Sequence, residues 1–141
     1  MRTFNLTIGL GLFVSALAGC SSDSVSSLSV GECLNVSNLG TEVAEAPTVK
    51  CSTEHEAEVI AVFDLDLDLP KYDEQAITKA VDERCMNEFS KYVGLDYLNS
   101  TLDLGYFIPI EARWSAGDRQ VICYVGLAEG KITETVKGSA K

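Results

Sequence analysis

A chain of 141 residues has room for one domain of ordinary size, and its hydrophobic content of 46% is enough for a packed core. The formal net charge is −10, and it becomes −11 when residues 1–19 are set aside, because they contain Arg2 and no acidic residue. This acidity argues against nucleic acid as a partner, since binding to phosphates requires a basic surface, and against adhesion to anionic lipid through a polybasic patch.

Residues 1–19 have the parts of a secretory signal peptide: an early arginine, a mostly apolar run over residues 6–18, and small residues at the end. The apolar run is too short to cross about 30 Å of hydrocarbon comfortably. The tetrad Leu17-Ala18-Gly19-Cys20 resembles the lipobox of bacterial lipoproteins, whose cysteine receives a diacylglycerol and becomes the N-terminus after cleavage. We therefore expect a lipoprotein, anchored through Cys20 to the extracytoplasmic face of the cell membrane. The alternative is an ordinary cleaved signal with a cysteine nearby by chance.

Residues 20–29 are rich in serine and contain no aromatic side chain. This composition is typical of a flexible tether. No repeat and no second linker interrupts the rest of the chain, so one domain is expected over residues 30–141.

His55 is the only histidine in the chain, and three glutamates surround it. An imidazole can act as a general base or as one metal ligand. No nucleophile and no second imidazole is identifiable by spacing, which favours a structural role, with the ring nitrogens bonded to the backbone or to the segment around Asp118 and Arg119.

The first predicted strand spans residues 56–65, where apolar side chains dominate both faces. The residues assigned to one face are Val59, Ala61, Phe63 and Leu65, and those assigned to the other are Ile60 and Val62. An inner strand, covered on both sides, is therefore expected.

Asp64, Asp66 and Asp68 alternate with leucines at the end of this strand. Clustered carboxylates suit a hard cation such as Ca²⁺, but Leu69-Pro70 stands where a calcium loop would need its glycine. We expect instead a strand edge with acids facing water, which also blocks edge-to-edge pairing.

A helix is predicted over residues 73–93, because the apolar spacing changes there from two to four. The apolar stripe is formed by Ile77, Val81, Cys85 and Phe89. Asp73 is the expected N-cap and Gly94 the expected C-terminal stop.

Two more strands are predicted over residues 102–109 and 120–127, and the second places Val121, Cys123 and Val125 on one face. Between them, a helical turn stopped by Gly117 is expected to cover Trp114, a side chain that more often belongs to a core than to a ligand platform. Asp118 and Arg119 are expected to form a local ion pair that fixes the turn.

Besides Cys20 the chain contains Cys33, Cys51, Cys85 and Cys123. An even number of cysteines in an exported chain favours two disulfides. Zinc sites usually contain a C-x₂-C pair, which is absent here, and only one histidine is available. Three pairings are open; a helix lying on a sheet would bring inward Cys85 to inward Cys123, which favours Cys85–Cys123 together with Cys33–Cys51. The expected fold class is α+β: a small, mainly antiparallel sheet with one main helix packed on it and two disulfides.

The order of these features resembles the septum formation domain family of actinobacterial exported proteins and lipoproteins. The matching residues are Gly31-Glu32-Cys33-Leu34, Cys51, His55, Glu58-Val59, Cys85, Phe89, Tyr92, Gly94, Tyr106, Pro109, Trp114, Gly117-Asp118-Arg119 and Cys123. The chain departs from the family pattern at Glu54, where the family usually has proline, and only loosely matches its C-terminal segment around Lys137-Gly138-Ser139. The resemblance implies an exported, disulfide-bonded domain with a role in cell division, and it assigns no catalytic residue or ligand.

The function expected from the sequence is that of a non-catalytic interaction module whose partner is an envelope or division protein. The alternative is a lipoprotein that binds a small ligand or a cation in a pocket near His55 and Trp114. An enzyme is the third hypothesis, and a thiol oxidoreductase is its weakest form because the chain has no C-x-x-C motif. No cofactor and no resident metal ion are expected.

Overall fold

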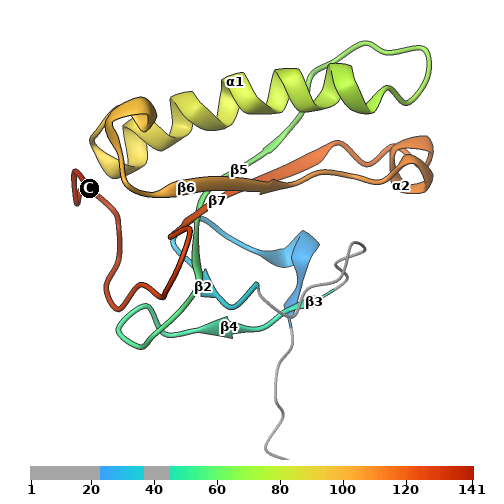
Figure 1. Ribbon diagram of the computed structural model, residues 1–141. Coiled ribbons are helices and arrows are strands. Elements are labelled where there is room, and N and C mark those ends of the chain that lie inside the picture. The colour runs from blue at the N-terminus through green and yellow to red at the C-terminus, as the bar shows by residue number, and fades with distance from the viewer. Residues whose placement is uncertain (1–22, 37–44) are drawn as a thin grey trace, which may run out of the picture.

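A computed structural model describes residues 23–36 and 45–141, which form a five-stranded antiparallel sheet with a long helix across one face, and a separate pair of short strands (Figure 1). The expected signal peptide and Cys20 lie outside the described residues. In spatial order the strands of the sheet are β4 (Thr48–Val49), β2 (Cys33–Leu34), β5 (Ala57–Asp64), β7 (Gln120–Gly126) and β6 (Asp103–Phe107). The helix is α1 (Glu74–Val93). The α+β fold class is confirmed.

Short elements complete the described fold. They are β1 (Asp23–Ser24), which pairs with β3 (Glu45–Ala46), and the single turns η1 (Val25–Ser27), η2 (Tyr97–Asn99) and α2 (Glu111–Ser115). Neither helix in residues 23–36 and 45–141 is both long and apolar enough to cross a bilayer.

Helix α1 begins and ends where the sequence predicts. The Asp73 side chain accepts a hydrogen bond from the Ala76 N–H, and Gly94 ends the helix in the left-handed conformation, with φ of 84°. The buried residues of the helix are Ile77, Val81, Cys85, Phe89 and Val93. The apolar stripe therefore packs on the sheet.

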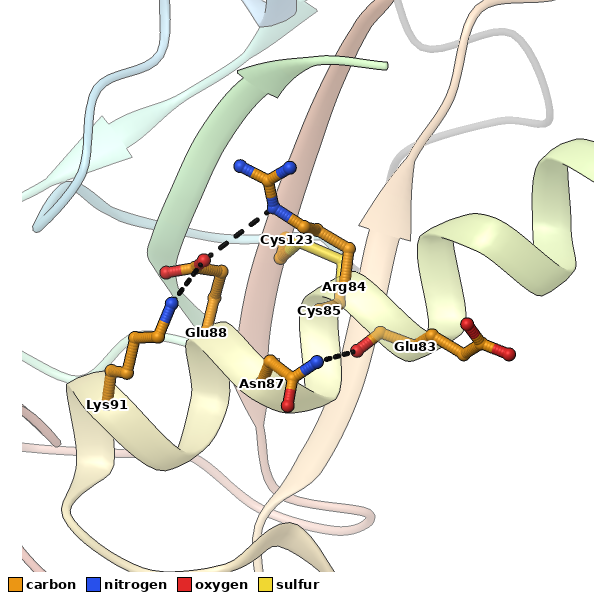
Figure 2. Close-up of polar contacts among 7 residues, drawn as sticks. All are labelled: Glu83, Arg84, Cys85, Asn87, Glu88, Lys91 and Cys123. Atoms are coloured by element: carbon orange, nitrogen blue, oxygen red, sulfur yellow. Dashed lines mark hydrogen bonds and ion pairs between the residues drawn. A yellow bond between two sulfur atoms is a disulfide. The ribbon is translucent and has the colours of Figure 1, made fainter. Parts of the chain in front are cut away.

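Both predicted disulfides are confirmed. Cys85 of α1 is bonded to Cys123 of β7, with Cα atoms 5.7 Å apart and neither side chain exposed (Figure 2). Cys33 of β2 is bonded to Cys51, in the turn after β4, with Cα atoms 5.2 Å apart. The first bond joins helix to sheet, and the second closes a local loop.

Strand β5 contains an irregularity that the alternation did not predict. Its pairing with β7 shifts register between Val59 and Ala61, which is the signature of a β-bulge. An extra residue reverses the faces beyond it, so Ala61 faces α1 whereas Val59 packs on the opposite side of the sheet. The prediction that Val59 shares a face with Ala61 is therefore wrong.

The N-terminal segment also differs from expectation. The serine-rich composition predicts a flexible tether that includes residues 23–29, yet Val25 and Leu28 are buried against the face of the sheet opposite α1. The single 3₁₀ turn explains this, because residues three apart lie on the same side of such a turn. Val25 and Leu28 are therefore part of the packed structure, although they precede residue 30.

Candidate functional site

Trp114 and Arg119 form one unit at the end of the sheet where β5 finishes. The indole is buried under α2, which is followed by Gly117 with a φ of 97°, as the sequence predicts. The Arg119 guanidinium lies over the ring, 3.7 Å from its centroid, and its Nη1 donates to the backbone oxygens of Trp114 and Asp118, each at 2.8 Å. The Arg119 carbonyl accepts from the Leu65 N–H at 2.8 Å. Trp114 is thus a core residue, covered by a cation.

The expected ion pair between Asp118 and Arg119 is wrong. The Asp118 carboxylate accepts from Arg113 Nε at 2.7 Å and from the Gln120 N–H at 3.0 Å. Burial raises the pKa of Asp118, but these hydrogen bonds outweigh it and hold the pKa below its ordinary value. Arg119 is held instead by the Trp114 ring and two carbonyls, because its planar guanidinium can stack and donate at once.

An open depression of about 510 Å³ lies beside this unit. Its lining residues are Asp64, Leu65, Asp66, Gly117, Asp118, Arg119 and Gln120. Asp64, Asp66 and Asp68 are exposed, as expected, but they do not lie on a strand edge. Asp64 ends β5, which lies inside the sheet, and the other two belong to the loop toward α1.

His55 lies at the opposite end of β5 and is completely buried. Its backbone forms a bridge with Ile132, through N–H to oxygen bonds of 2.9 and 2.8 Å, and its Nδ1 lies 2.8 Å from the Thr53 carbonyl oxygen. Since Leu65 and Arg119 mark the far end of the strand, His55 and Trp114 do not share a pocket in the described part of the chain. The expectation of one pocket near both residues is therefore wrong. The extended strand β5 holds His55 and Trp114 at opposite ends of the sheet.

Glu58 is the residue that the sequence reasoning missed. Its carboxylate is completely buried and accepts three hydrogen bonds: from the Tyr92 hydroxyl at 2.6 Å, the Thr135 hydroxyl at 2.7 Å and the Val136 N–H at 2.8 Å. It therefore joins the sheet, the end of α1 and the C-terminal segment. Burial and the Glu58 carboxylate raise the pKa of Tyr92 above its ordinary value. The signal in the sequence was a single acid inside the apolar run of β5.

Cys33, His55 and Glu58 lie together beneath this end of the sheet. The Sγ atom, a ring nitrogen and a carboxylate oxygen are all within 4.8 Å of one another, and all three residues are buried. The strand pairing explains the cluster, because Cys33 of β2 lies directly opposite Glu58 of β5. The structure thus contains a polar cluster at each end of β5.

The family model described as septum formation matches residues 17–140, which is most of the chain. No curated protein and no solved structure matches. The family match supports a role related to cell division. This chain belongs to the septum formation family.

Proposed function

We propose that the protein is a lipoprotein, anchored through Cys20 on the extracytoplasmic face of the cell membrane, and that it acts there as a non-catalytic interaction module during septum formation. The pair of disulfides carries this proposal, because disulfides form and persist in oxidising environments outside the cytoplasm. The apolar run before Cys20 supplies the export signal that such a location requires.

The anchor would hold the domain close to the lipid. Only Ser21 and Ser22 separate Cys20 from β1, so the chain can extend by about 10 Å at most between the lipidated residue and the fold. Helix α1 lies on the other side of the sheet from β1 (Figure 1). The outer face of α1 would therefore point away from the membrane, where a partner can reach it.

The outer face of α1 carries charged side chains, and several of its residues contact one another. Glu88 contacts Arg84 at 3.7 Å and Lys91 at 2.9 Å, and Asn87 Nδ2 donates to the Glu83 carbonyl oxygen at 3.0 Å (Figure 2). A shallow groove of about 580 Å³ runs along the first turns of the helix. Its lining residues are Glu74, Gln75, Thr78, Lys79, Asp82 and Glu83. Three carboxylates against one lysine favour a partner with a basic surface.

The test is the location of the full-length protein, tagged at its C-terminus, in dividing cells. We expect the wild type in the membrane fraction and concentrated at septa, and we expect Cys20→Ala to leave the membrane or to stall before processing. Membrane retention of a processed Cys20→Ala variant, or an even distribution of the wild type around the cell, would contradict the proposal.

A charge-reversal pair tests the surface. Glu74→Lys with Glu83→Lys should abolish septal concentration while leaving membrane attachment unchanged, because both side chains are exposed. Glu129→Lys with Glu134→Lys is the matched control, since it makes the same change of charge at exposed positions that belong to the C-terminal segment and not to the groove on α1. Equal effects of the two pairs would assign the loss to net charge rather than to the helix surface.

A further inference from the structure

The buried imidazole of His55 has one nitrogen without a partner. A carbonyl oxygen can only accept a hydrogen bond, so the 2.8 Å contact with Thr53 assigns the proton of the neutral ring to Nδ1. Nε2 then presents a lone pair, and among the described residues no donor reaches it. An unpaired buried acceptor is unfavourable, because it loses its hydrogen bond to water and gains none in return.

The groups beside this lone pair are metal ligands by type. A thiolate, an imidazole and a carboxylate all bind Zn²⁺, at about 2.3 Å for sulfur and about 2.0–2.2 Å for nitrogen and oxygen, which places the ligand atoms of a tetrahedral site about 3.3–3.8 Å apart. The Cys33, His55 and Glu58 atoms are within 4.8 Å of one another already. Cys51 is covalently attached to Cys33, so its sulfur is adjacent to the same group.

We propose that reduction of the Cys33–Cys51 disulfide opens a Zn²⁺ site whose ligands are Cys33, Cys51, His55 and Glu58. The oxidised protein holds both sulfurs in their mutual bond and cannot form the site. Glu58 retains one of about four lone-pair positions after its three hydrogen bonds. A divalent cation would balance the negative charge that two thiolates bring beside this buried carboxylate.

The neighbours of these ligands already orient them. Metal-binding histidines usually donate their other ring N–H to a carbonyl or carboxylate, and the Thr53 carbonyl oxygen takes this position at Nδ1. The Glu58 carboxylate is fixed by Tyr92, Thr135 and Val136. The site therefore needs a movement of the two sulfurs and little rearrangement of the other ligands.

A dithiol can act as the reductant of the Cys33–Cys51 disulfide. An exported dithiol protein would give two electrons and two protons to the Cys33–Cys51 bond, producing two thiols and becoming a disulfide itself. Zn²⁺ would then displace the two thiol protons to solvent. Cys51 is partly exposed on a turn, whereas neither Cys85 nor Cys123 is exposed, so mild reduction should open Cys33–Cys51 first.

The absence of a C-x₂-C pair is explained by the strand pairing. Cys51, His55 and Glu58 are close in sequence, but Cys33 reaches them only because β2 pairs with β5, with Cys33 opposite Glu58. Residues facing each other across two antiparallel strands have Cβ atoms about 4.5–5.5 Å apart. A ligand set assembled in this way has no recognisable spacing in the sequence.

The test uses the full-length chain with Cys20→Ser, so that only the four other cysteines can bind metal. A water-soluble phosphine reduces the protein until two thiols per chain are titrated, taking the oxygen of one water molecule to become the phosphine oxide. Reduced and oxidised samples are then titrated with Zn²⁺, and with Co²⁺ as a spectroscopic probe. We expect the reduced protein to bind one Zn²⁺ and to show thiolate-to-cobalt charge transfer, and the oxidised protein to do neither.

Two controls distinguish Zn²⁺ binding at the proposed four-ligand site from weak Zn²⁺ binding by free thiols alone. X-ray absorption of the reduced, zinc-loaded protein should give two sulfur and two lighter ligands, a measurement that leaves all four proposed ligands in place. His55→Gln should weaken Zn²⁺ binding by at least about tenfold relative to reduced wild type. A reduced wild-type protein that binds Zn²⁺ no more tightly than the oxidised one, or a coordination shell with sulfur alone, would overturn the proposal.

Discussion

Replacing Glu58 with Gln should destabilise the protein strongly, although the two side chains have nearly the same shape. The amide oxygen can still accept from the Tyr92 and Thr135 hydroxyls, which both donate to Oε1 in the wild type. The amide nitrogen would then face the Val136 N–H, so that two donors oppose each other. Leaving a buried donor unsatisfied costs about 1–3 kcal/mol.

The loss of negative charge adds to this cost. A hydrogen bond to a charged acceptor contributes about 1.5–3 kcal/mol and one to a neutral acceptor about 0.5–1.5 kcal/mol, so the two hydroxyl bonds also weaken. The lower desolvation penalty of the amide offsets part of the loss, and the net decrease in the free energy of unfolding should be about 2–4 kcal/mol. For a domain of this size, this corresponds to a fall in Tm of roughly 8–16 °C.

The assay is urea denaturation of the oxidised protein, followed by circular dichroism, with Glu54→Gln as the control because Glu54 is exposed and lies in the same segment. The control should stay within about 0.5 kcal/mol of the wild type. A double-mutant cycle with Tyr92→Phe should give a coupling energy of at least about 0.5 kcal/mol, as expected for residues in one network. A Glu58→Gln variant as stable as the control would refute the role assigned to this carboxylate.

Three further perturbations test other parts of the fold. The free energy of unfolding of the Cys85→Ser, Cys123→Ser double variant should be about 2–5 kcal/mol lower than that of the wild type, since a native disulfide is removed. An unchanged Tm would contradict the placement of α1 on β7. Arg119→Lys should lower the free energy of unfolding by about 1–2 kcal/mol, because an ammonium group cannot stack on the indole and bond two carbonyls at once. It should also shift the fluorescence of Trp114, the only tryptophan in the sequence, and an unchanged spectrum would argue against the stack. The pKa of Tyr92 is raised in the folded protein above the unfolded value of about 10, so the free energy of unfolding should fall as the pH rises above that value. The urea midpoint of Tyr92→Phe should fall less steeply across this pH range than that of the wild type.

The helix and the disulfides were predictable because each rests on strong local patterns. The four-residue spacing of α1 and the capping residues Asp73 and Gly94 define one amphipathic helix, and that helix can bury Cys85 only against the sheet. The pairing with Cys123 then follows from strand alternation in β7. Local periodicity, together with the requirement that the apolar face of the helix packs on the sheet, was sufficient to predict this part of the fold.

The polar clusters were not predictable in the same way, because they depend on contacts between distant segments. Alternation in β5 cannot reveal the bulge before Ala61, which appears only in the pairing with β7. The partners of Glu58 come from α1 and from the C-terminal segment, and 78 residues separate it from Val136. Sequence adjacency predicts an ion pair between Arg119 and Asp118, because it does not show that a buried indole offers the guanidinium a better contact.

The most direct test of the account is the intact mass of the protein purified in detergent from cell membranes. We predict a chain that begins at Cys20, lacks residues 1–19, carries a diacylglycerol on the Cys20 sulfur and is lighter by four hydrogens than the fully reduced chain, as two disulfides require. A mature chain with a free thiol at Cys20, or a membrane-bound chain that retains its leader without lipid, would contradict the proposal that this septum formation family member is a lipoprotein.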